Sequence, residues 1–432
     1  MFSIIAIIIS LAVVVFLAFK KVNIVIVSII AAILLAVMDG QNILESLTGT
    51  FMSGAAEYVK NFFLLFCISA LFGKVMEETG AAASIAKWLA NLLGEKYAIL
   101  GVVFAGMLLC YGGISALVIA FTMYPLALAL FKRANLPRRL IPGAIAAGCF
   151  TFAAAAFPGT PQTMNVIPTT YLGTTVGAAP VLGIICGVIG VTLTCIYMYR
   201  ESKKARANGE GFTADEETLK ILEKADQMGA DVHPVIAILP IVVIIVLLVV
   251  CKINILLAML IGTVLCAVLL HKNVKNIPSM LEDSIKNGMG AAVTTGCIVG
   301  YGSVVSASTG FEVLSQALTS MHTTPLLSFG LASAILSGAA GSGTGGLGIT
   351  MSSMADQYLA MGLSPEVLHR VGALSAIGLD SLPHNGAVVV LLTLCGMTHK
   401  DSYKQIFVTT VVFTVIVAAI AIVLGTIMYP TN

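Results

Sequence analysis

One apolar stretch near the end of the chain is interrupted by polar residues at a depth where a membrane helix tolerates few of them. The apolar runs Val371–Ile377 and Ala387–Leu394 flank Gly378-Leu379-Asp380-Ser381-Leu382-Pro383-His384-Asn385-Gly386. Together they are long enough to cross a bilayer, which takes roughly 20 residues. Unpaired polar groups are costly in hydrocarbon, so a broken, polar backbone at this depth must line a cavity or be buried in protein. We therefore expect this stretch to form half of a substrate site inside a membrane transporter.

The composition supports a membrane protein with many spans. Of the 432 residues, 58% are hydrophobic and only 10% are charged, and the mean hydropathy is +1.00. A soluble protein carries about 25% charged residues. No basic patch is interleaved with aromatic residues, so no nucleic-acid partner is expected. The predicted surroundings are the lipid bilayer of the cell membrane, and no cofactor is predicted.

Apolar runs define the predicted membrane spans. Runs that fit one crossing each lie at 2–19, 22–38, 58–76, 140–157, 176–198, 234–251, 254–271, 288–305, 366–380 and 405–428. Two further apolar segments, 97–131 and 325–362, are too long for one straight span, and glycine and hydroxyl residues cut each near its middle. We predict a re-entrant hairpin for each. The long polar segment 200–232 is predicted to be a solvated linker, with a short amphipathic helix over 215–228.

The parts of the chain before and after this linker look like copies of each other. Five matches occur in the same order, at offsets falling from 231 to 225: Lys21-Val22-Asn23-Ile24 with Lys252-Ile253-Asn254-Ile255, Thr79-Gly80 with Thr309-Gly310, Gly113 with Gly341, Pro137 with Pro365, and Pro158 with Pro383. Such an ordered set indicates a duplication. We predict an all-α polytopic membrane protein with two inverted-topology repeats, each with about five transmembrane helices, a re-entrant hairpin and a broken helix.

The predicted domains follow from this duplication. They are a first repeat at 1–199 (scaffold 1–95, hairpin and broken helix 96–199), a cytoplasmic linker at 200–233, and a second repeat at 234–432 (scaffold 234–322, hairpin and broken helix 323–432). With the linker inside, 20 of the 23 Lys and Arg residues face the cytoplasm, and only Lys60, Lys252 and Arg370 face outside. This bias predicts that both termini lie outside.

Each predicted repeat contains two interruptions of apolar helix. They are 111–115 and 158–162 in the first repeat, and 341–346 and 381–386 in the second. Half-helices that begin after these breaks would point N–H groups and positive dipole ends inward. Because no Arg or Lys lies inside an apolar run near the breaks, we predict that the helix ends themselves bind an anion. For any single break, helix packing through small residues is the alternative explanation.

The predicted site residues come from these four breaks. The residues expected to bind substrate are Gly113, Ser115, Thr160, Gln162, Ser342, Gly343, Thr344, Ser381, His384 and Asn385. Asp380 is the only acid placed well inside an apolar span, and it is expected either to couple a proton or cation to transport or to be an N-cap at the helix break, with its carboxylate accepting backbone N–H bonds. His384 could bind a carboxylate or relay a proton when protonated, or serve as a neutral hydrogen-bonding histidine. No metal site is predicted.

With these residues in view, the chain resembles the gluconate permease family of the ion-transporter superfamily. The resemblance covers nearly the whole chain. It rests on the duplicated layout, the Gly-Ser-Gly-Thr-Gly-Gly tip at 341–346, and the broken helix carrying Asp380, Ser381, Pro383, His384 and Asn385. It implies proton-coupled uptake of a small hydroxylated carboxylate such as gluconate, a related sugar acid, 3-hydroxybutyrate or D-serine. It also implies a homodimer and an elevator-type motion of the hairpins and broken helices against a scaffold of spans 2–76 and 234–305.

Three other functions stay open. Sodium-dependent di- and tricarboxylate transport is one, although the sodium-dependent dicarboxylate members of the superfamily carry Ser-Asn-Thr at such tips, where this chain has Gly-Ile-Ser and Ser-Gly-Thr. A passive channel is the second, and the duplicated broken helices argue against it. An intramembrane enzyme is the third, and no two of the six histidines fall at ligand spacing on one helix. The chain is therefore predicted not to be an enzyme.

Overall fold

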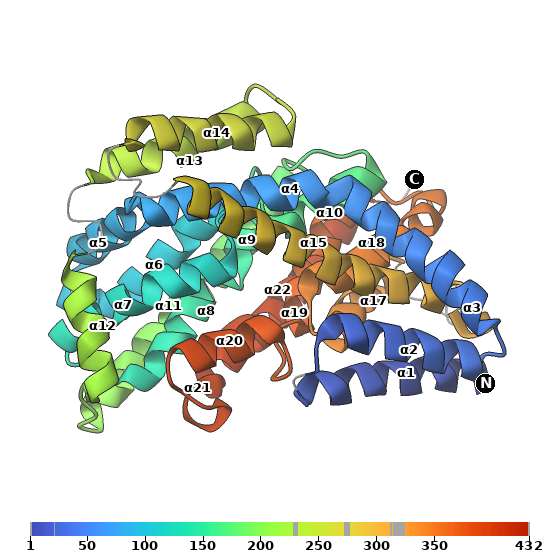
Figure 1. Ribbon diagram of the computed structural model, residues 1–432, viewed down its shortest axis with the longest axis horizontal. Coiled ribbons are helices and arrows are strands. Elements are labelled where there is room, and N and C mark those ends of the chain that lie inside the picture. Colours follow the sequence, from blue (N-terminus) through green and yellow to red (C-terminus); the bar gives the residue numbers. More distant parts are fainter. Residues whose placement is uncertain are drawn as a thin grey trace.

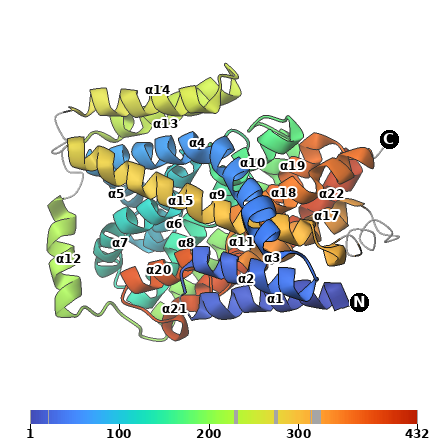
Figure 2. The same ribbon diagram turned by 45° about the vertical axis from the view of Figure 1, so that its right-hand side comes forward.

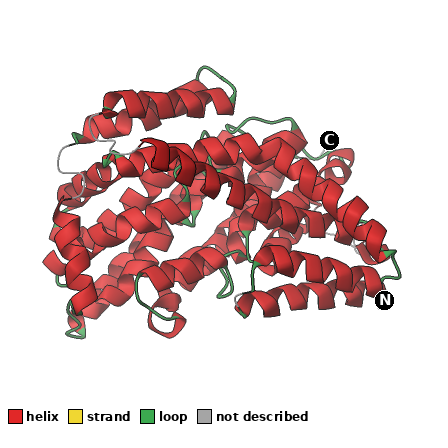
Figure 3. Ribbon diagram, in the orientation of Figure 1, coloured by secondary structure: helices red, strands yellow, loops and turns green. Residues whose placement is uncertain are grey.

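The computed structural model describes residues 2–20, 22–227, 232–271, 277–311, 313 and 325–430. All regular structure in these residues is helical (Figures 1 and 3). Among them, five helices are long and apolar enough to cross a membrane, at 43–78, 116–133, 180–207, 277–306 and 399–428. The prediction of a multi-pass all-α membrane protein is therefore confirmed. Lys21, Lys272, Lys275, linker residues 228–231 and the 322/323 boundary lie outside the described residues.

The helices before and within the linker follow the predicted order. They are α1 (Phe2–Phe19), α2 (Ile24–Met38), α3 (Ile43–Glu45), η1 (Ser46–Phe51), α4 (Met52–Glu78), α5 (Ala81–Leu93), η2 (Glu95–Tyr97), α6 (Ala98–Tyr111), α7 (Ala116–Arg133), η3 (Arg138–Leu140), α8 (Ile141–Cys149), α9 (Phe152–Ala155), α10 (Thr163–Leu172), α11 (Pro180–Ala207) and α12 (Glu216–Gln227). The predicted linker helix over 215–228 is thus α12.

The helices after the linker follow a similar order. They are α13 (Pro234–Val249), α14 (Ile255–Leu269), α15 (Ile277–Ser306), α17 (Pro325–Ala340), α18 (Gly343–Ala360), α19 (Pro365–Leu379), α20 (Gly386–Leu394), α21 (His399–Ile406), η5 (Phe407–Val412) and α22 (Phe413–Met428). The matched asparagines of the two halves also act alike. Asn23 and Asn254 accept from the backbone N–H two residues later, each at 2.9 Å, at the start of α2 and α14.

Several predicted spans have other bounds in the structure. The spans 58–76 and 288–305 belong to longer helices, since 43–78 is one continuous rod and α15 begins at residue 277. The single span 140–157 is wrong. Thr151 leaves the helical region at φ −127° and ψ −140°, and after the single turn of α9 the chain is irregular from 156 to 162, where two prolines lack N–H donors. The helix break is therefore wider than predicted.

Each long apolar segment forms two helices that pack against each other, α6 with α7 and α17 with α18. Gly113 (φ +92°) and Gly341 (φ +57°) make the turns, in a backbone region that other residues rarely adopt. The second tip is shorter than predicted, because α18 already begins at Gly343. A Cβ on Gly346 would lie 2.2 Å from the Cα of Ser337, so this glycine allows α17 and α18 to approach closely. At Gly346 the helix-packing explanation holds.

The long helices α4 and α15 pack side by side through glycines (Figure 2). A Cβ on Gly288 would lie 2.7 Å from the Cα of Cys67, and one on Gly300 would lie 2.6 Å from the carbonyl oxygen of Phe51. Without a hydrophobic effect between helices in lipid, such close backbone contact is a main source of helix association. These two helices lie beside the hairpin helices α18 and α7.

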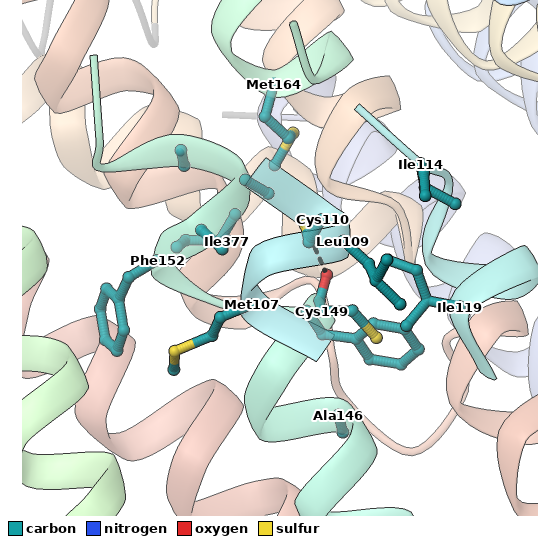
Figure 4. Close-up of a cluster of buried hydrophobic side chains, with 14 of the residues drawn as sticks. Met107, Leu109, Cys110, Ile114, Ile119, Ala146, Cys149, Phe152, Met164 and Ile377 are labelled. Atoms are coloured by element: carbon teal, nitrogen blue, oxygen red, sulfur yellow. Dashed lines mark hydrogen bonds between the residues drawn. The ribbon is translucent and has the colours of Figure 1, made fainter. Parts of the chain in front are cut away.

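The first hairpin tip rests on a packed apolar base (Figure 4). Leu109 and Ile114 from the tip are fully buried, as is Phe152 of α9. The thiol of Cys110 donates to the carbonyl of Cys149 at 3.5 Å, which ties the end of α6 to the end of α8. The first tip is therefore held in place by its packing against the hydrophobic core.

The described part of the linker is attached to the first half by two arginines. Arg139 donates to both carboxylate oxygens of Glu210, at 2.7 and 2.9 Å, and Arg138 lies 3.0 Å from Asp215. The hydrogen bonds from Arg139 hold the pKa of Glu210 below its ordinary value. Helix α12 packs against α7. The linker is thus fixed along the surface of the hairpin.

Candidate functional site

A cavity of about 650 Å³ lies where the two hairpin tips and the two helix breaks meet. Its polar and glycine lining includes nine of the eleven predicted site residues: Ser115, Gln162, Ser342, Gly343, Thr344, Asp380, Ser381, His384 and Asn385. Thr294, Thr295 and Ile298 of α15 and Val22 and Ile24 beside the start of α2 also line it. Segments far apart in the sequence are therefore brought together as predicted, and α15 forms part of the same cavity.

Two predicted residues, Gly113 and Thr160, do not line this cavity. A Cβ on Gly113 would lie 2.6 Å from Cγ of Pro161, so the glycine lets the first tip pack directly on the first break. Thr160 is fully buried, and its carbonyl accepts from Asn165 at 2.9 Å. Each of the two residues lies two positions before a lining residue, Gly113 before Ser115 and Thr160 before Gln162.

Four helices begin at the cavity, namely α7, α10, α18 and α20. The side-chain oxygens of Ser115, Ser342 and Asn385 each accept from the backbone N–H three residues later, at 3.4, 3.2 and 2.9 Å. Gln162 precedes α10 without a side-chain cap. Helix starts carry partial positive charge and N–H groups without intrahelical partners, so their convergence favours an anion.

The side-chain amides of Gln162 and Asn385 are used within the protein. Nε2 of Gln162 donates to the carbonyls of Cys110 and Ile114, at 2.7 and 2.9 Å. Nδ2 of Asn385 donates to the carbonyl of Gly341 at 3.0 Å and to a second carbonyl in its own break at 2.8 Å. An amide nitrogen has two hydrogens, so Gln162 uses both of its donors on the first tip, whereas Asn385 uses one on the second tip and one on its own break. The hydroxyl groups of the lining, by contrast, can rotate toward a ligand.

Asp380 lies at the end of α19 with its carboxylate in the cavity lining. One oxygen accepts from the hydroxyl of Ser381 at 2.8 Å. The other faces the backbone N–H of Gly343 at the start of α18, where a Cβ would lie 2.6 Å away. Asn385, and not Asp380, caps α20. The other part of the capping alternative holds, because the carboxylate of Asp380 accepts from the backbone N–H groups of Gly343 and Ser381. The carboxylate of Asp380 thus lies at the start of α18, the second helix of the second hairpin.

His384 connects the second break to its hairpin. Its Nε2 lies 2.9 Å from the carbonyl oxygen of Gly338 in α17, and the side chain is buried. A carbonyl can only accept, so Nε2 carries a hydrogen in this contact. Beside it in the lining, the hydroxyls of Ser342 and Thr344 lie 3.3 Å apart.

The statement that no Arg or Lys lies in an apolar run near the breaks is wrong. Arg370 lies within α19 and is fully buried. It donates to the carbonyl of Ala155 at 2.6 Å and to Oδ1 of Asn165 at 2.9 Å. Each of these partners is next in sequence to a residue that lines the cavity, Ala154 and Met164 respectively. The sequence signal was the polar pair His369-Arg370 inside the predicted span 366–380.

The lining chemistry is that of a binding site. Among the described residues, no group of three or more His, Cys, Asp or Glu residues could hold a metal ion. The cavity lining combines one carboxylate and one imidazole with hydroxyls and helix starts, and the lining residues include no Lys or Arg. Such a set can bind a small polar anion and can bind or release a proton at Asp380 or His384.

The comparison with known families agrees with this architecture. Residues 2–428 match the family described as GntP family permease. The chain belongs to the GntP permease family. The uncharacterized transporter YxjC of Bacillus subtilis is 34% identical to this permease over 464 residues, which cover 97% of this chain and 98% of the relative. An uncharacterized transporter of Haemophilus influenzae is 26% identical over 351 residues and 78% of each chain.

The fold of this GntP permease is also found in a solved transporter structure. The YdaH transporter of Alcanivorax borkumensis, described as having an unusual topology, superposes with a TM-score of 0.58, covering 89% of this chain and 88% of that one, at 14% identity. At that identity the likeness concerns the fold alone. The resemblance derived from the sequence is confirmed, and the GntP permease is a multi-pass membrane transporter by family.

Proposed function

We propose that this permease is a symporter that takes up a small hydroxylated carboxylate, such as gluconate, a related sugar acid or 3-hydroxybutyrate, together with protons. The observation that carries the proposal is the cavity in which four helix starts, a row of hydroxyls and one carboxylate meet. Helix starts bind the carboxylate group of a ligand, and hydroxyls of Ser115, Ser342, Thr344 and Ser381 bind its hydroxyl groups.

Asp380 supplies the proposed coupling. Its carboxylate already faces the Gly343 N–H, which is the kind of group that a substrate carboxylate needs. Two carboxylates close together cannot both stay ionised without strong repulsion. Protonation of Asp380 therefore frees the start of α18 for the substrate, and substrate binding in turn favours the protonated acid. This exchange links one proton to one bound anion.

The surroundings of the cavity support an elevator-type movement as part of the proposal. The hairpin and broken-helix elements α6–α11 and α17–α22 supply the polar lining, whereas α2 and α15 contribute mainly Thr and apolar residues. We infer that these two sets are the moving part and the scaffold of two inverted repeats, divided as the sequence predicts. A homodimer, a cytoplasmic linker and termini on the outside complete the proposal.

Uptake by purified protein in proteoliposomes tests this function. The panel consists of gluconate, 3-hydroxybutyrate, D-serine, succinate and citrate, each with an inward proton gradient, with and without a protonophore. The expected result is accumulation of a hydroxylated monocarboxylate that collapses with the protonophore and persists when choline replaces sodium. Dependence on sodium would support the alternative carrier of di- or tricarboxylates. Equilibration without accumulation would identify a channel, and chemical conversion of an acid, seen by mass spectrometry, would identify an enzyme.

A further inference from the structure

A buried arginine of the second half is bonded to the helix break of the first half. Arg370 in α19 donates to the carbonyls of Ala155 (2.6 Å) and Ala178 (2.6 and 3.2 Å) and to the side-chain oxygen of Asn165 (2.9 Å). Its side chain is fully buried. The guanidinium thus joins the end of α9, the start of α10 and the segment before α11. These three pieces flank the break at 156–162.

Asn165 extends this network to the break itself. Its Nδ2 donates to the carbonyls of Thr160 and Val176, at 2.9 and 2.8 Å, while its Oδ1 accepts from Arg370 and lies 3.1 Å from Nε2 of His369. Every hydrogen-bonding atom of the Asn165 side chain therefore has a defined partner. Arg370 fixes the orientation of the amide, and the amide fixes the irregular backbone.

The charge of Arg370 is not neutralised by a direct ion pair. None of the ion pairs within 4.0 Å in the described residues includes it. Glu366, one turn earlier in α19, is close enough to interact electrostatically with Arg370. Its carboxylate, however, accepts a hydrogen bond from the backbone N–H of Ala179. Breaking the contacts of a buried charge is costly, which makes Arg370 a firm attachment point.

We propose that Arg370 is a positioning residue that holds the first-half break in the shape required by the cavity. The hydrogen bonds run from Arg370 through Asn165 to Thr160, two residues before Gln162, which holds the first hairpin tip. Arg370, a residue of the second half, thereby fixes the start of α10 through its hydrogen bond to Asn165. The planar guanidinium suits this task because it donates in several directions at once, which an ammonium group on a flexible chain does not reproduce.

A neighbouring glycine lies against both partners of this contact, the break and the guanidinium. A Cβ on Gly183 in α11 would lie 2.4 Å from the carbonyl oxygen of Ala156 and 3.1 Å from Nε of Arg370. Gly183→Ala therefore crowds the carbonyl of Ala156 in the break first and the guanidinium second, while the charge stays in place. It disturbs the contact without removing the charge.

Hydrogen–deuterium exchange of the purified full-length protein tests the proposal without any substrate. Peptides covering 152–179 report the first break, and peptides covering 338–346 and 380–390 report the second tip and break. In Arg370→Gln we expect about tenfold faster exchange or more in 152–179, the equivalent of one lost hydrogen bond to a charged group, and no change in the second break. Arg370→Lys and Gly183→Ala should show smaller increases in the same peptides. The exposed exchange Lys400→Arg serves as a control.

Two results would overturn the positioning role. One is unchanged exchange over 152–179 in Arg370→Gln and Gly183→Ala, and the other is an equal increase in both breaks, which would mean general loosening. If Arg370→Gln cannot be purified, Arg370→Lys decides the outcome. The effect of Arg370 on substrate binding rests on the proposed function. Once a transported acid has been identified, Arg370→Lys should raise its KM about tenfold with little change in kcat. A wild-type protein that carries none of the acids tests only the proposed function, because the exchange result stands without it.

Discussion

Gln162 and Asn385 stand in equivalent places in the two halves, each directly before a helix that begins at the cavity and each donating to a carbonyl of the hairpin tip beside it. Each side chain thereby ties a hairpin to a broken helix. The relationship explains how two irregular segments can keep a defined shape inside a membrane, where every backbone carbonyl needs a donor.

Replacing these amides by acids of the same shape should therefore damage the site. In Gln162→Glu and Asn385→Asp the nitrogen donors are lost and a carboxylate oxygen faces carbonyl oxygens. We expect uptake to fall about tenfold or more, because a buried acceptor left without its donor costs about 1–3 kcal/mol. Initial uptake rates in proteoliposomes measure the effect. The exposed Asn91→Asp is the matched control, and wild-type rates in both site variants would refute the tip-holding role.

Close helix packing in the second hairpin predicts a stability difference between two glycines. Gly346→Ala places a methyl group 2.2 Å from the Cα of Ser337, so α17 and α18 must separate. We expect a loss of about 1–3 kcal/mol, visible as a lower Tm of the detergent-solubilised protein. Gly290→Ala in α15 meets nothing within 4 Å and should leave Tm unchanged or raise it. Equal Tm values for Gly346→Ala and the wild type would contradict the packing.

The attachment of the linker should weaken in acid. Hydrogen bonds from Arg139 lower the pKa of Glu210, so this contact adds stability above the ordinary carboxyl pKa and loses it as pH falls through the lowered value. Limited proteolysis within 208–227 should therefore be slow at neutral pH and speed up only below about pH 4. Arg139→Gln should show fast cleavage at neutral pH already. Cleavage of the wild type that does not vary with pH would argue against this contact.

The sequence carries the positions of the breaks because they depend on local chemistry. Gly113 and Gly341 make turns that need positive φ. Ser115, Ser342 and Asn385 each precede a helix directly and accept from the backbone N–H three residues later, a pattern that sequence spacing can indicate. These signals gave the hairpins and most of the cavity lining.

The partners of the long polar side chains could not be obtained in the same way. Arg370 bonds to Asn165, 205 positions earlier, and the orientation of Gln162 depends on how the first tip folds back over it. Hydropathy counts Arg370 as a charge near a span end, and only the packing of α19 against α9 and α10 shows it as buried. Long-range contacts of this kind depend on tertiary structure and produce no periodic pattern in the sequence.

The central claim is that Asp380 and the carboxylate of the substrate compete for the start of α18, so that proton binding and anion binding are linked. The most direct test compares wild type, Asp380→Asn and the exposed control Asp356→Asn in proteoliposomes, using the acid that the wild type carries. The account predicts that Asp380→Asn still exchanges labelled for unlabelled acid across the membrane but no longer accumulates it when a proton gradient is imposed, while Asp356→Asn behaves as the wild type. Full, pH-dependent accumulation by Asp380→Asn would contradict the account.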